Sequence, residues 1–289
     1  MFTPLVSVVT LCHGQGQFLS EAAGSLACQS YDHFELILAC GDRESAEVAR
    51  GIGDRGVGSP TILTDLVRGR ADAFNRAVGA SRGQYIVRLD ADDKLDPTAL
   101  SKMVATAEGA DPVIVTSNVQ QFGELHGVWD LGGRLTTSAD AVESPGNMIH
   151  CSSLFSRELW DKTGGYERAL FGHEDFDFWV KCARHAPTVR KVGETLLHYR
   201  EHQQDSLERR SHAFLCAAIR FLNFPATPGD VLVLISASEE IKDKVRRHAE
   251  WFPDHEPAQR LVKVVGKSLA DVERGLLDEA DKLLGRVSP

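Results

Sequence analysis

Short apolar runs alternate along the chain with segments in which apolar residues recur every three or four positions. Residues 5–11 and 34–40 form the first two runs, and both are nearly continuous apolar stretches, as buried parallel strands are. Residues 18–26, which lie between them, have the apolar spacing of one helix face. The alternation continues to about residue 205 and predicts an α/β fold in which helices flank a mostly parallel central sheet.

An acidic cluster directly follows the apolar run at residues 85–89. Asp90, Asp92 and Asp93 lie within four residues, and Asp96 lies just beyond them. Such a cluster has two interpretations, an acidic turn after an edge strand or a divalent-metal site at the carboxyl end of a strand. The second interpretation fits the place where open α/β sheets bind their ligands, and Mg²⁺ and Mn²⁺ prefer carboxylate oxygens.

The pattern becomes mainly helical beyond residue 205, so we expect two domains, at residues 1–209 and 210–289. Residues 231–235 are a short apolar insertion in this helical part. Ser236 with Glu239 has the spacing of a capping box, and Ser268 with Asp271 begins a last helix whose apolar face runs through Leu269, Val272, Leu276, Leu277, Ala280 and Leu284. The simplest interpretation is that these helices cover a face of the sheet. A role in acceptor binding or in a homodimer interface is the alternative.

The composition narrows the classes of function. The chain has 289 residues, 43% hydrophobic and 25% charged, with a formal net charge of −9. An acidic chain is a poor candidate for non-specific nucleic-acid binding, although a metal or a local basic pocket can still hold a polyphosphate. The N-terminus has no signal-peptide pattern and no run approaches about 18 apolar residues. We therefore expect a cytoplasmic protein without a transmembrane segment, whose association with a membrane would be peripheral.

The six cysteines are scattered and form no CxxC pair, which argues against a zinc site and against a thioredoxin-type motif. They fit buried or partly buried thiols in a reducing compartment. Their positions are Cys12, Cys28, Cys40, Cys151, Cys182 and Cys216.

Several motifs occur in the order found in inverting family 2 glycosyltransferases, which have the Rossmann-like GT-A fold. Residues 6–19 resemble the opening of that family, and residues 29–37 and 75–85 resemble its next segments. The LDADD sequence at residues 89–93 resembles the DxD metal motif, and the GHED sequence at residues 172–175 resembles the ED motif. The resemblance covers about residues 4–205, and its specificity comes from the ordered set of motifs.

The resemblance implies a metal-dependent inverting transferase that moves a sugar from a nucleoside-diphosphate sugar to an acceptor hydroxyl. A bound Mn²⁺ or Mg²⁺ would neutralise the departing diphosphate. Asp92 is the expected direct ligand, Asp90 the contact to the ribose or to metal-bound water, and His202 a late residue that completes the site, with His198 as its competitor. The acceptor, whether a saccharide, a lipid-linked group or a small molecule, is not indicated.

The same resemblance assigns Asp175 as the base that deprotonates the acceptor, with Glu174 as second choice. A base next to another carboxylate has a reason for a raised pKa, which suits that task. The simpler interpretation of this acidic pair is a charged helix N-terminus. Phe178 and Trp179 are expected in the core rather than as a sugar-stacking platform. The residues implied on the nucleotide side are Thr10, Leu11, Cys12, Cys40, Asp42, Arg70, Asn75, Asp90 and Ala91.

The sequence departs from the family pattern where the nucleobase is read. Many members carry two aspartates at the end of the second strand, where this chain has Cys40 and Gly41, and Asp42 comes slightly later. Leu11 and Gly14 replace the usual proline and asparagine of the first loop. A UDP-sugar remains the first expectation for the donor, and GDP and dTDP donors stay open.

Two other functions remain to be weighed. A nucleotidyltransferase would need a first loop rich in glycine and in lysine or arginine to hold a triphosphate, and residues 12–17 contain neither lysine nor arginine. A catalytically altered, nucleotide-binding protein with the same fold would fit the change at Cys40. The presence of Asp90, Asp92 and Asp175 argues against it.

Overall fold

The computed structural model describes residues 3–53, 57–64, 68–132, 149–202, 210–271 and 274. It divides the chain into two compact units, which are described separately. The first comprises Met1–Arg168 and His173–Asp205, and the second comprises Ala169–Gly172 and Ser206–Pro289. The domain boundary expected after residue 209 lies outside the described residues.

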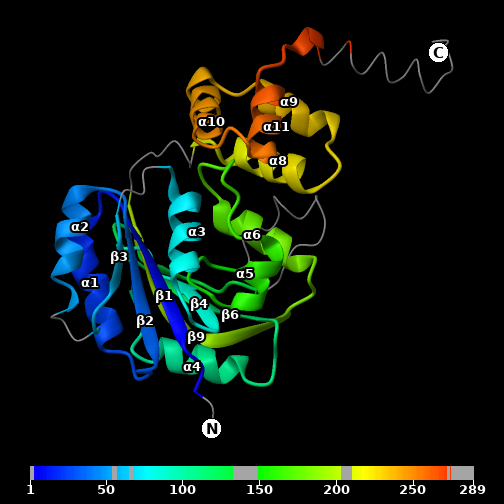
Figure 1. Ribbon diagram of the computed structural model, residues 1–289. Coiled ribbons are helices and arrows are strands. Elements are labelled where there is room, and N and C mark those ends of the chain that lie inside the picture. Colours follow the sequence, from blue (N-terminus) through cyan, green and yellow to red (C-terminus); the bar gives the residue numbers. More distant parts are fainter. Residues whose placement is uncertain are drawn as a thin grey trace. The chain divides into compact units, whose positions relative to one another are not determined.

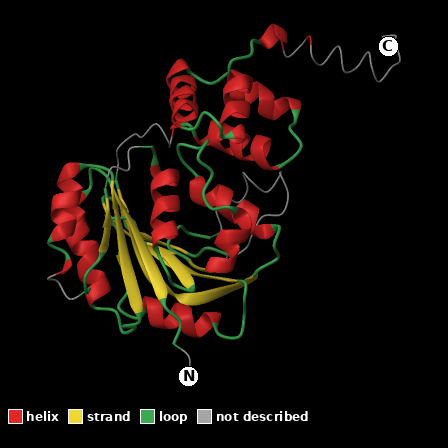
Figure 2. Ribbon diagram, in the orientation of Figure 1, coloured by secondary structure: helices red, strands yellow, loops and turns green. Residues whose placement is uncertain are grey.

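The first unit is built on a single sheet, in which nine strands of the described residues take part (Figures 1 and 2). The strands are β1 Val6–Cys12, β2 Phe34–Cys40, β3 Thr61–Leu63, β4 Tyr85–Arg88, β5 Lys94–Leu95, β6 Val113–Gly123, β7 Gly127–Trp129, β8 Leu154–Ser156 and β9 Thr188–Glu201. Their order is β3-β2-β1-β4-β8-β6-β9-β5, and β7 pairs with β6. The expected parallel arrangement holds for β3, β2, β1 and β4, whereas β8 runs antiparallel between β4 and β6.

Helices cover both faces of this sheet, which confirms the α/β class. Alternate residues of β1 point to opposite faces. Val8 belongs to the core packed by α1 (Gly16–Ala27), α2 (Arg43–Arg50) and α4 (Ala99–Ala107). Val9 belongs to the core packed by α3 (Arg70–Ala80), α5 (Arg157–Thr163) and α6 (Glu174–Ala183). The second core also contains Phe178 and Trp179, both buried, so their interpretation as core residues is confirmed.

The parallel strands bring their carboxyl ends to one edge of the sheet. Cys12 is paired with Cys40 in register, and Val9 with Arg88. The loops that follow β1, β2 and β4 therefore meet at this edge, where α/β folds bind their ligands. We call it the carboxyl edge.

Hydrogen bonds through one glutamate fix the opposite ends of the same strands. Ser7 Oγ donates to Glu35 Oε1 at 2.8 Å, and the backbone N–H of Gly83 donates to Ser7 Oγ at 2.7 Å. Arg82 adds contacts to Glu35 Oε2 from Nε at 3.1 Å and from Nη2 at 3.0 Å. These bonds tie the beginnings of β1 and β2 to the turn before β4.

Asp42 joins the first loop to the start of α2. Its Oδ1 accepts from the backbone N–H of Ser45 at 2.8 Å, which is a helix N-cap. Its Oδ2 accepts from Ser45 Oγ at 2.7 Å and from the backbone N–H of Gly14 at 2.8 Å. Hydrogen bonds from the Ser45 backbone, from the Ser45 hydroxyl and from Gly14 outweigh burial and lower the pKa of Asp42 to about 2.

The second unit is helical in its described part, with α8 His212–Asn223, α9 Pro228–Ile235, α10 Glu239–Trp251 and α11 Glu256–Val265. Residues 231–235, expected as an apolar insertion, are the body of α9, which begins with a capping box between Thr227 and Asp230. The capping box expected between Ser236 and Glu239 is wrong. Ser236 still ends α9, because its N–H donates to Leu232 O, and Ser238 caps α10.

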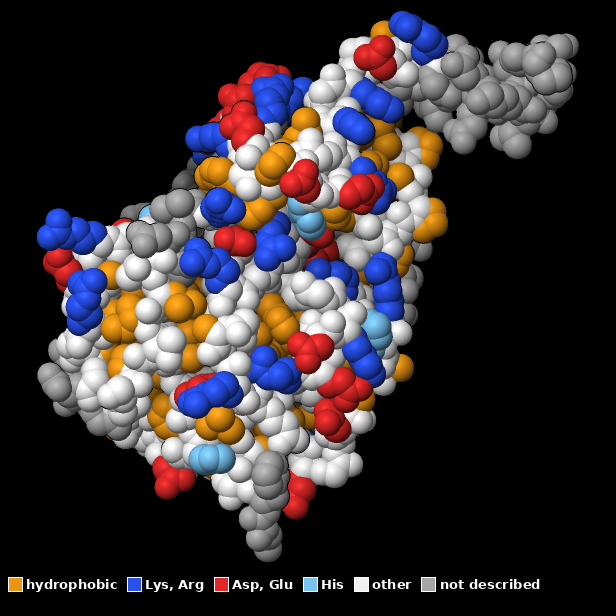
Figure 3. Space-filling model, viewed as in Figure 1, with side chains coloured by type: hydrophobic (Ala, Val, Ile, Leu, Met, Phe, Trp, Pro, Cys, Tyr) orange, Lys and Arg blue, Asp and Glu red, His pale blue; other side chains and the backbone are white. Residues whose placement is uncertain are grey.

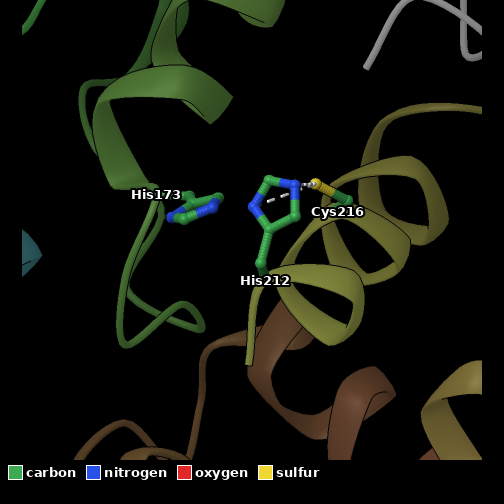
Figure 4. Close-up of side chains that lie close together, drawn as sticks. All are labelled: His173, His212 and Cys216. Carbon is green, nitrogen blue, oxygen red and sulfur yellow. Dashed lines mark hydrogen bonds between the residues drawn. The ribbon is translucent and has the colours of Figure 1, made fainter. Parts of the chain in front are cut away.

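The capping pair expected further along is confirmed. Asp271 Oδ2 accepts from the Ser268 N–H at 3.0 Å, and Ser268 Oγ accepts from the Asp271 N–H at 3.2 Å. Most of the apolar face expected after it, from Val272 to Leu284, lies outside the described residues. One helical turn holds His212 and Cys216 on the same face of α8, with His212 Nε2 at 3.7 Å from Cys216 Sγ (Figure 4).

The surface carries a mixture of charges. Acidic and basic side chains are interspersed on the face drawn in Figure 3. Exposed pairs such as Arg43 with Glu47 and Arg246 with Asp243 contribute little to stability in water. All six cysteines lie in the described part of the chain and are free thiols. Among the helices that the structure describes, none has the length and apolarity needed to span a bilayer.

Gly83→Ala should destabilise the protein. A Cβ at this position would lie 2.5 Å from the backbone N of Ser7 and 2.8 Å from the carbonyl O of Tyr85, and backbone atoms cannot rotate away. Overpacking of this kind costs about 1–3 kcal/mol of unfolding free energy, measurable by urea denaturation. Gly79→Ala is the matched control, because nothing lies within 4 Å of its Cβ on helix α3, and it should stabilise by about 0.5–1 kcal/mol. Equal stabilities for the two variants would contradict the close approach at Gly83.

Asp42→Ala should lower the unfolding free energy by about 1–2 kcal/mol at pH 7, because it removes a helix cap and its link to the first loop. The folded-state pKa of about 2 lies below the ordinary value of 3.8. The ionised carboxylate therefore stabilises the fold above about pH 4, and this contribution is lost as the pH falls toward 2. Urea titrations should show a smaller difference in unfolding free energy between wild type and variant at pH 2.5 than at pH 7. An equal difference at the two pH values would rule out the charged cap.

Candidate active site

The acidic cluster forms a tight turn at the carboxyl edge. The chain leaves β4 at Arg88, and Leu89 and Ala91 are fully buried beneath the turn. The N–H of Asp93 donates to the carbonyl O of Asp90 at 3.1 Å, which closes the turn. The alternation of buried and acidic residues therefore gathers three carboxylates at the end of one strand.

Asp92 and His202 meet although 110 positions separate them in the chain. Asp92 Oδ2 lies 2.9 Å from His202 Nε2 and accepts from Gln15 Nε2 at 2.7 Å. Burial, followed by the charge of Asp90, raises the pKa of Asp92. An adjacent carboxylate and imidazole fit the donor preferences of Mn²⁺, and the carboxylate also suits Mg²⁺. Two of the three residues expected at the metal thus lie in direct contact.

Arg200 holds this turn from the other side. Its backbone N–H donates to Asp93 Oδ1 at 2.8 Å, and its Nε donates to the carbonyl O of Asp92 at 3.0 Å. The guanidinium lies between the rings of Phe18 and Phe122, at 4.4 and 4.5 Å from their centroids. Burial, followed by the charges of Asp90 and Asp92, raises the pKa of Asp93 well above its ordinary value. Arg200 therefore fixes the loop that carries Asp92 without using the Asp92 carboxylate.

The third expected metal-side residue, Asp90, is bound by Arg88. Arg88 Nε lies 2.7 Å from Asp90 Oδ1, and Nη2 lies 2.8 Å from Asp90 Oδ2, so the contact is bidentate. The Asp90 side chain is 23% exposed. Arg88 thus engages both carboxylate oxygens of Asp90, whereas His202 and Gln15 both contact the same oxygen of Asp92, Oδ2.

The two candidates for the base have different surroundings. Helix α6 begins at Glu174, after His173 with a left-handed backbone at φ 56°. Glu174 is 1% exposed, and it is bound by Arg88 Nη1 at 3.1 Å and by Arg70 Nε at 3.2 Å. Asp175 lies in the same first turn and is half-buried. Glu174 is thus committed to two guanidinium groups, whereas Asp175 keeps partial access to solvent.

The nucleotide-side residues of β1 and β2 lie inside the sheet. Thr10, Leu11, Cys12 and Cys40 are all buried. Burial, followed by the proximity of Cys12, raises the pKa of the Cys40 thiol to about 12. A pocket of about 390 Å³ opens at the ends of β2 and β3, lined by Cys40, Gly41, Asp42, Arg43, Ala46, Arg50 and Thr64. Asp42 lines it, but its oxygens are already engaged by Ser45 and Gly14.

Asn75 is the expected nucleotide contact that the structure places elsewhere. Its Nδ2 donates to the carbonyl O of Tyr166 at 2.9 Å, and its Oδ1 accepts from the Tyr166 N–H at 2.9 Å. The side chain thus fixes the turn before α6 rather than facing the carboxyl edge. His198, the competitor of His202, pairs with Lys94 within the sheet.

Three residues at this edge were not among the expected site residues, namely Gln15, Arg88 and Arg200. Arg88 carried a signal, because an arginine inside an otherwise apolar strand is buried only with partners. Arg200 lies two residues before His202, so the segment that indicated His202 also brings Arg200 to this edge. Gln15 carried no signal, since a glutamine in a polar loop is commonplace.

Comparison with known proteins identifies the family. The model of "Glycosyl transferase family 2" matches residues 7–163, more than half of the chain. The O-antigen biosynthesis glycosyltransferase WbnJ of Escherichia coli is 24% identical over 229 residues, which cover 76% of this chain and 89% of WbnJ. The putative glycosyltransferase EpsE of Bacillus subtilis is 27% identical, with 73% and 78% covered. The uncharacterised protein y4gI of Sinorhizobium fredii is 27% identical, and the match spans only 21% of its length.

Solved structures agree on the fold. TarS of S. aureus in complex with UDP-GlcNAc has a TM-score of 0.60 at 12% identity, with 85% of this chain and 71% of that chain covered. The mannosyltransferase PcManGT of Pyrobaculum calidifontis, in complex with GDP-Man and Mn²⁺, has a TM-score of 0.54 at 16% identity, with 98% and 81% covered. These likenesses confirm the GT-A fold. With the family match, they confirm the expected enzyme class, and the chain belongs to glycosyl transferase family 2.

Proposed function

We propose that this chain transfers a sugar from a nucleoside-diphosphate sugar to an acceptor hydroxyl, with metal dependence and with inversion at the anomeric carbon. The observation that carries the proposal is the arrangement at the carboxyl edge. Asp92 contacts His202 in the acidic turn, and Arg88 joins Asp90 of that turn to Glu174, the residue before the half-buried Asp175. The names of the two solved relatives, with UDP-GlcNAc and with GDP-Man and Mn²⁺, support the donor class.

On the donor side, Asp92 and His202 would hold Mn²⁺ or Mg²⁺. When bound, the metal supplies positive charge to the departing diphosphate. Gln15 orients the Asp92 carboxylate through its 2.7 Å hydrogen bond, and Arg200 fixes the backbone of the turn. Asp90 contributes negative charge beside the ribose or beside metal-bound water, held in place by Arg88.

On the acceptor side, Asp175 accepts the proton of the attacking hydroxyl. The acceptor oxygen forms a bond to the anomeric carbon as the bond from that carbon to the diphosphate oxygen breaks on the opposite face. The nucleoside diphosphate then leaves with the electron pair, and the configuration is inverted. Glu174 is the weaker candidate for this proton transfer, because its carboxylate is buried against two arginines.

The pocket at the ends of β2 and β3 is the proposed place for the nucleobase. Its cationic side-chain donors are Arg43 and Arg50, which suit the carbonyl oxygens of a base edge. Uracil is the first expectation, and guanine and thymine also carry such oxygens. The acceptor is left undefined by these contacts.

Calorimetric titration with UDP, GDP and dTDP tests the donor and the metal. UDP should bind on the order of tenfold or more tightly with Mn²⁺ than with EDTA. Asp92→Ala should weaken the metal-dependent binding by roughly 10- to 100-fold, since it removes a metal ligand. Absence of metal-enhanced binding of any nucleoside diphosphate would overturn the proposal. Metal-dependent binding without transfer from any donor sugar would instead favour the altered, nucleotide-binding protein.

Asp175→Asn should abolish transfer and leave donor binding intact. The amide cannot accept the proton, so kcat should fall by about 10²- to 10⁴-fold, while the Kd for the nucleoside diphosphate with Mn²⁺ stays near that of wild type. Asp161→Asn serves as control, because Asp161 is exposed on α5. Normal turnover of Asp175→Asn would show that another group is the base, and Glu174→Gln would then be measured in the same assay.

A further inference from the structure

Arg88 lies between the two halves of the carboxyl edge, and its side chain is only 4% exposed. It is the last residue of β4, two positions before Asp90. Its three nitrogens are divided between two partners. Nε and Nη2 hold both oxygens of Asp90, at 2.7 and 2.8 Å, and Nη1 holds Glu174 Oε1 at 3.1 Å. One guanidinium therefore connects the metal-side turn to the first residue of α6.

Two aromatic rings pack beside this guanidinium. The rings of Phe74 and Tyr166 are stacked, with centroids 4.5 Å apart, and the Arg88 guanidinium carbon lies 5.9 Å from each centroid. Asn75 holds the backbone of Tyr166 through two hydrogen bonds of 2.9 Å. The rings thus help to bury the guanidinium, and its hydrogen bonds to Asp90 and Glu174 set its orientation.

Arg70 cannot replace this connection. It contacts Glu174 from the exposed side, with Nε at 3.2 Å and Nη2 at 3.3 Å. Arg70 therefore holds Glu174, and Arg88 alone of these two arginines also binds Asp90. Without Arg88, the carboxylates of Asp90 and Glu174 would share a buried space without the cation between them, and like charges in such a place repel. The first turn of α6 would then shift away from the acidic turn and carry Asp175 with it.

We propose that Arg88 is a positioning residue that sets the place of Asp175 relative to the metal-side turn, by holding Asp90 and Glu174 on one planar fork. The role rests on the proposed transfer reaction. Asp92 is fixed by separate contacts, with Gln15 and His202 at its carboxylate and Arg200 at its backbone. Loss of Arg88 therefore affects the chemical step more than the binding of donor and metal.

The test compares Arg88→Met, Arg88→Lys and the control Arg82→Met in the full chain. Arg82 also forms a two-nitrogen contact with a carboxylate, that of Glu35, but it lies outside the site and is 80% exposed. Each variant is measured by calorimetry with UDP and Mn²⁺, for Kd and stoichiometry, and by steady-state kinetics with the donor that wild type uses. Stoichiometry reports the folded fraction and so separates a positioning role from loss of fold.

Arg88→Met should lower kcat on the order of 100-fold, as a misplacement of about 1 Å does, with a change in Kd of less than about threefold. Arg88→Lys keeps the charge but not the fork, so it should restore only a small part of the loss. Arg82→Met should match wild type in kcat and Kd. A kcat of Arg88→Met near wild type, full recovery by Arg88→Lys, or a loss of kcat that parallels the loss of stoichiometry would each overturn the role.

A second measurement applies if Arg88→Met does not fold. Arg88→Lys combined with Glu174→Gln should lose no more kcat than the worse of the two single variants, because both act through one contact. If the two single losses of kcat multiply in the double variant, the two residues act independently, and the coupling would be overturned.

A wild-type protein that transfers sugar from no donor would overturn the proposed function itself, and this role with it. A normal wild type with an unaffected Arg88→Met would overturn the positioning role alone.

Discussion

Repulsion among carboxylates is the constraint on which the carboxyl edge depends. Asp90, Asp92, Asp93 and Glu174 are gathered there, largely shielded from water. Arg88 balances part of this charge from within the chain, and His202 meets Asp92 directly. The remaining negative charge suits the divalent cation that we propose for this site. The fold thus satisfies some carboxylates internally and keeps others for the ligand.

The sequence predicted the parts of the fold that depend on local pattern. The first two strands and the helix between them follow from periodicity, and the acidic turn follows from a buried strand that ends in aspartates. The antiparallel insertion of β8 between β4 and β6 could not be predicted, because strand pairing is a long-range property of a three-residue segment. Residues 231–235 were ambiguous for a local reason, because a short apolar run suits a strand as well as a buried helix. Ser236 and Ser238 are equally good caps by type, and Ser238 caps α10 because Ser236 still ends α9.

The site shows a similar division. Motif order brought Asp92 and His202 together, and the structure places them 2.9 Å apart. The resemblance ranked Asp175 above Glu174, but the sequence could not show the two arginines that approach Glu174 from β4 and α3. Asp42 and Asn75 were assigned to the nucleotide by position, yet their side chains make structural contacts, with Ser45 and Gly14 and with Tyr166. A polar side chain near a motif is a poor guide to its partner until the backbone around it is known.

The short strand β5 changes how the acidic turn behaves. The chain leaves β4 at Arg88 and re-enters the same sheet at Lys94, where β5 pairs with β9 at the far end of the strand order. Five residues therefore connect two anchored points, and the hydrogen bond from Asp93 N–H to the carbonyl O of Asp90 closes a turn within them. The conformational entropy of this loop is lost during folding and not during ligand binding. The acidic turn is a preorganised connection, and a change in its length by one residue would alter the spacing of its carboxylates.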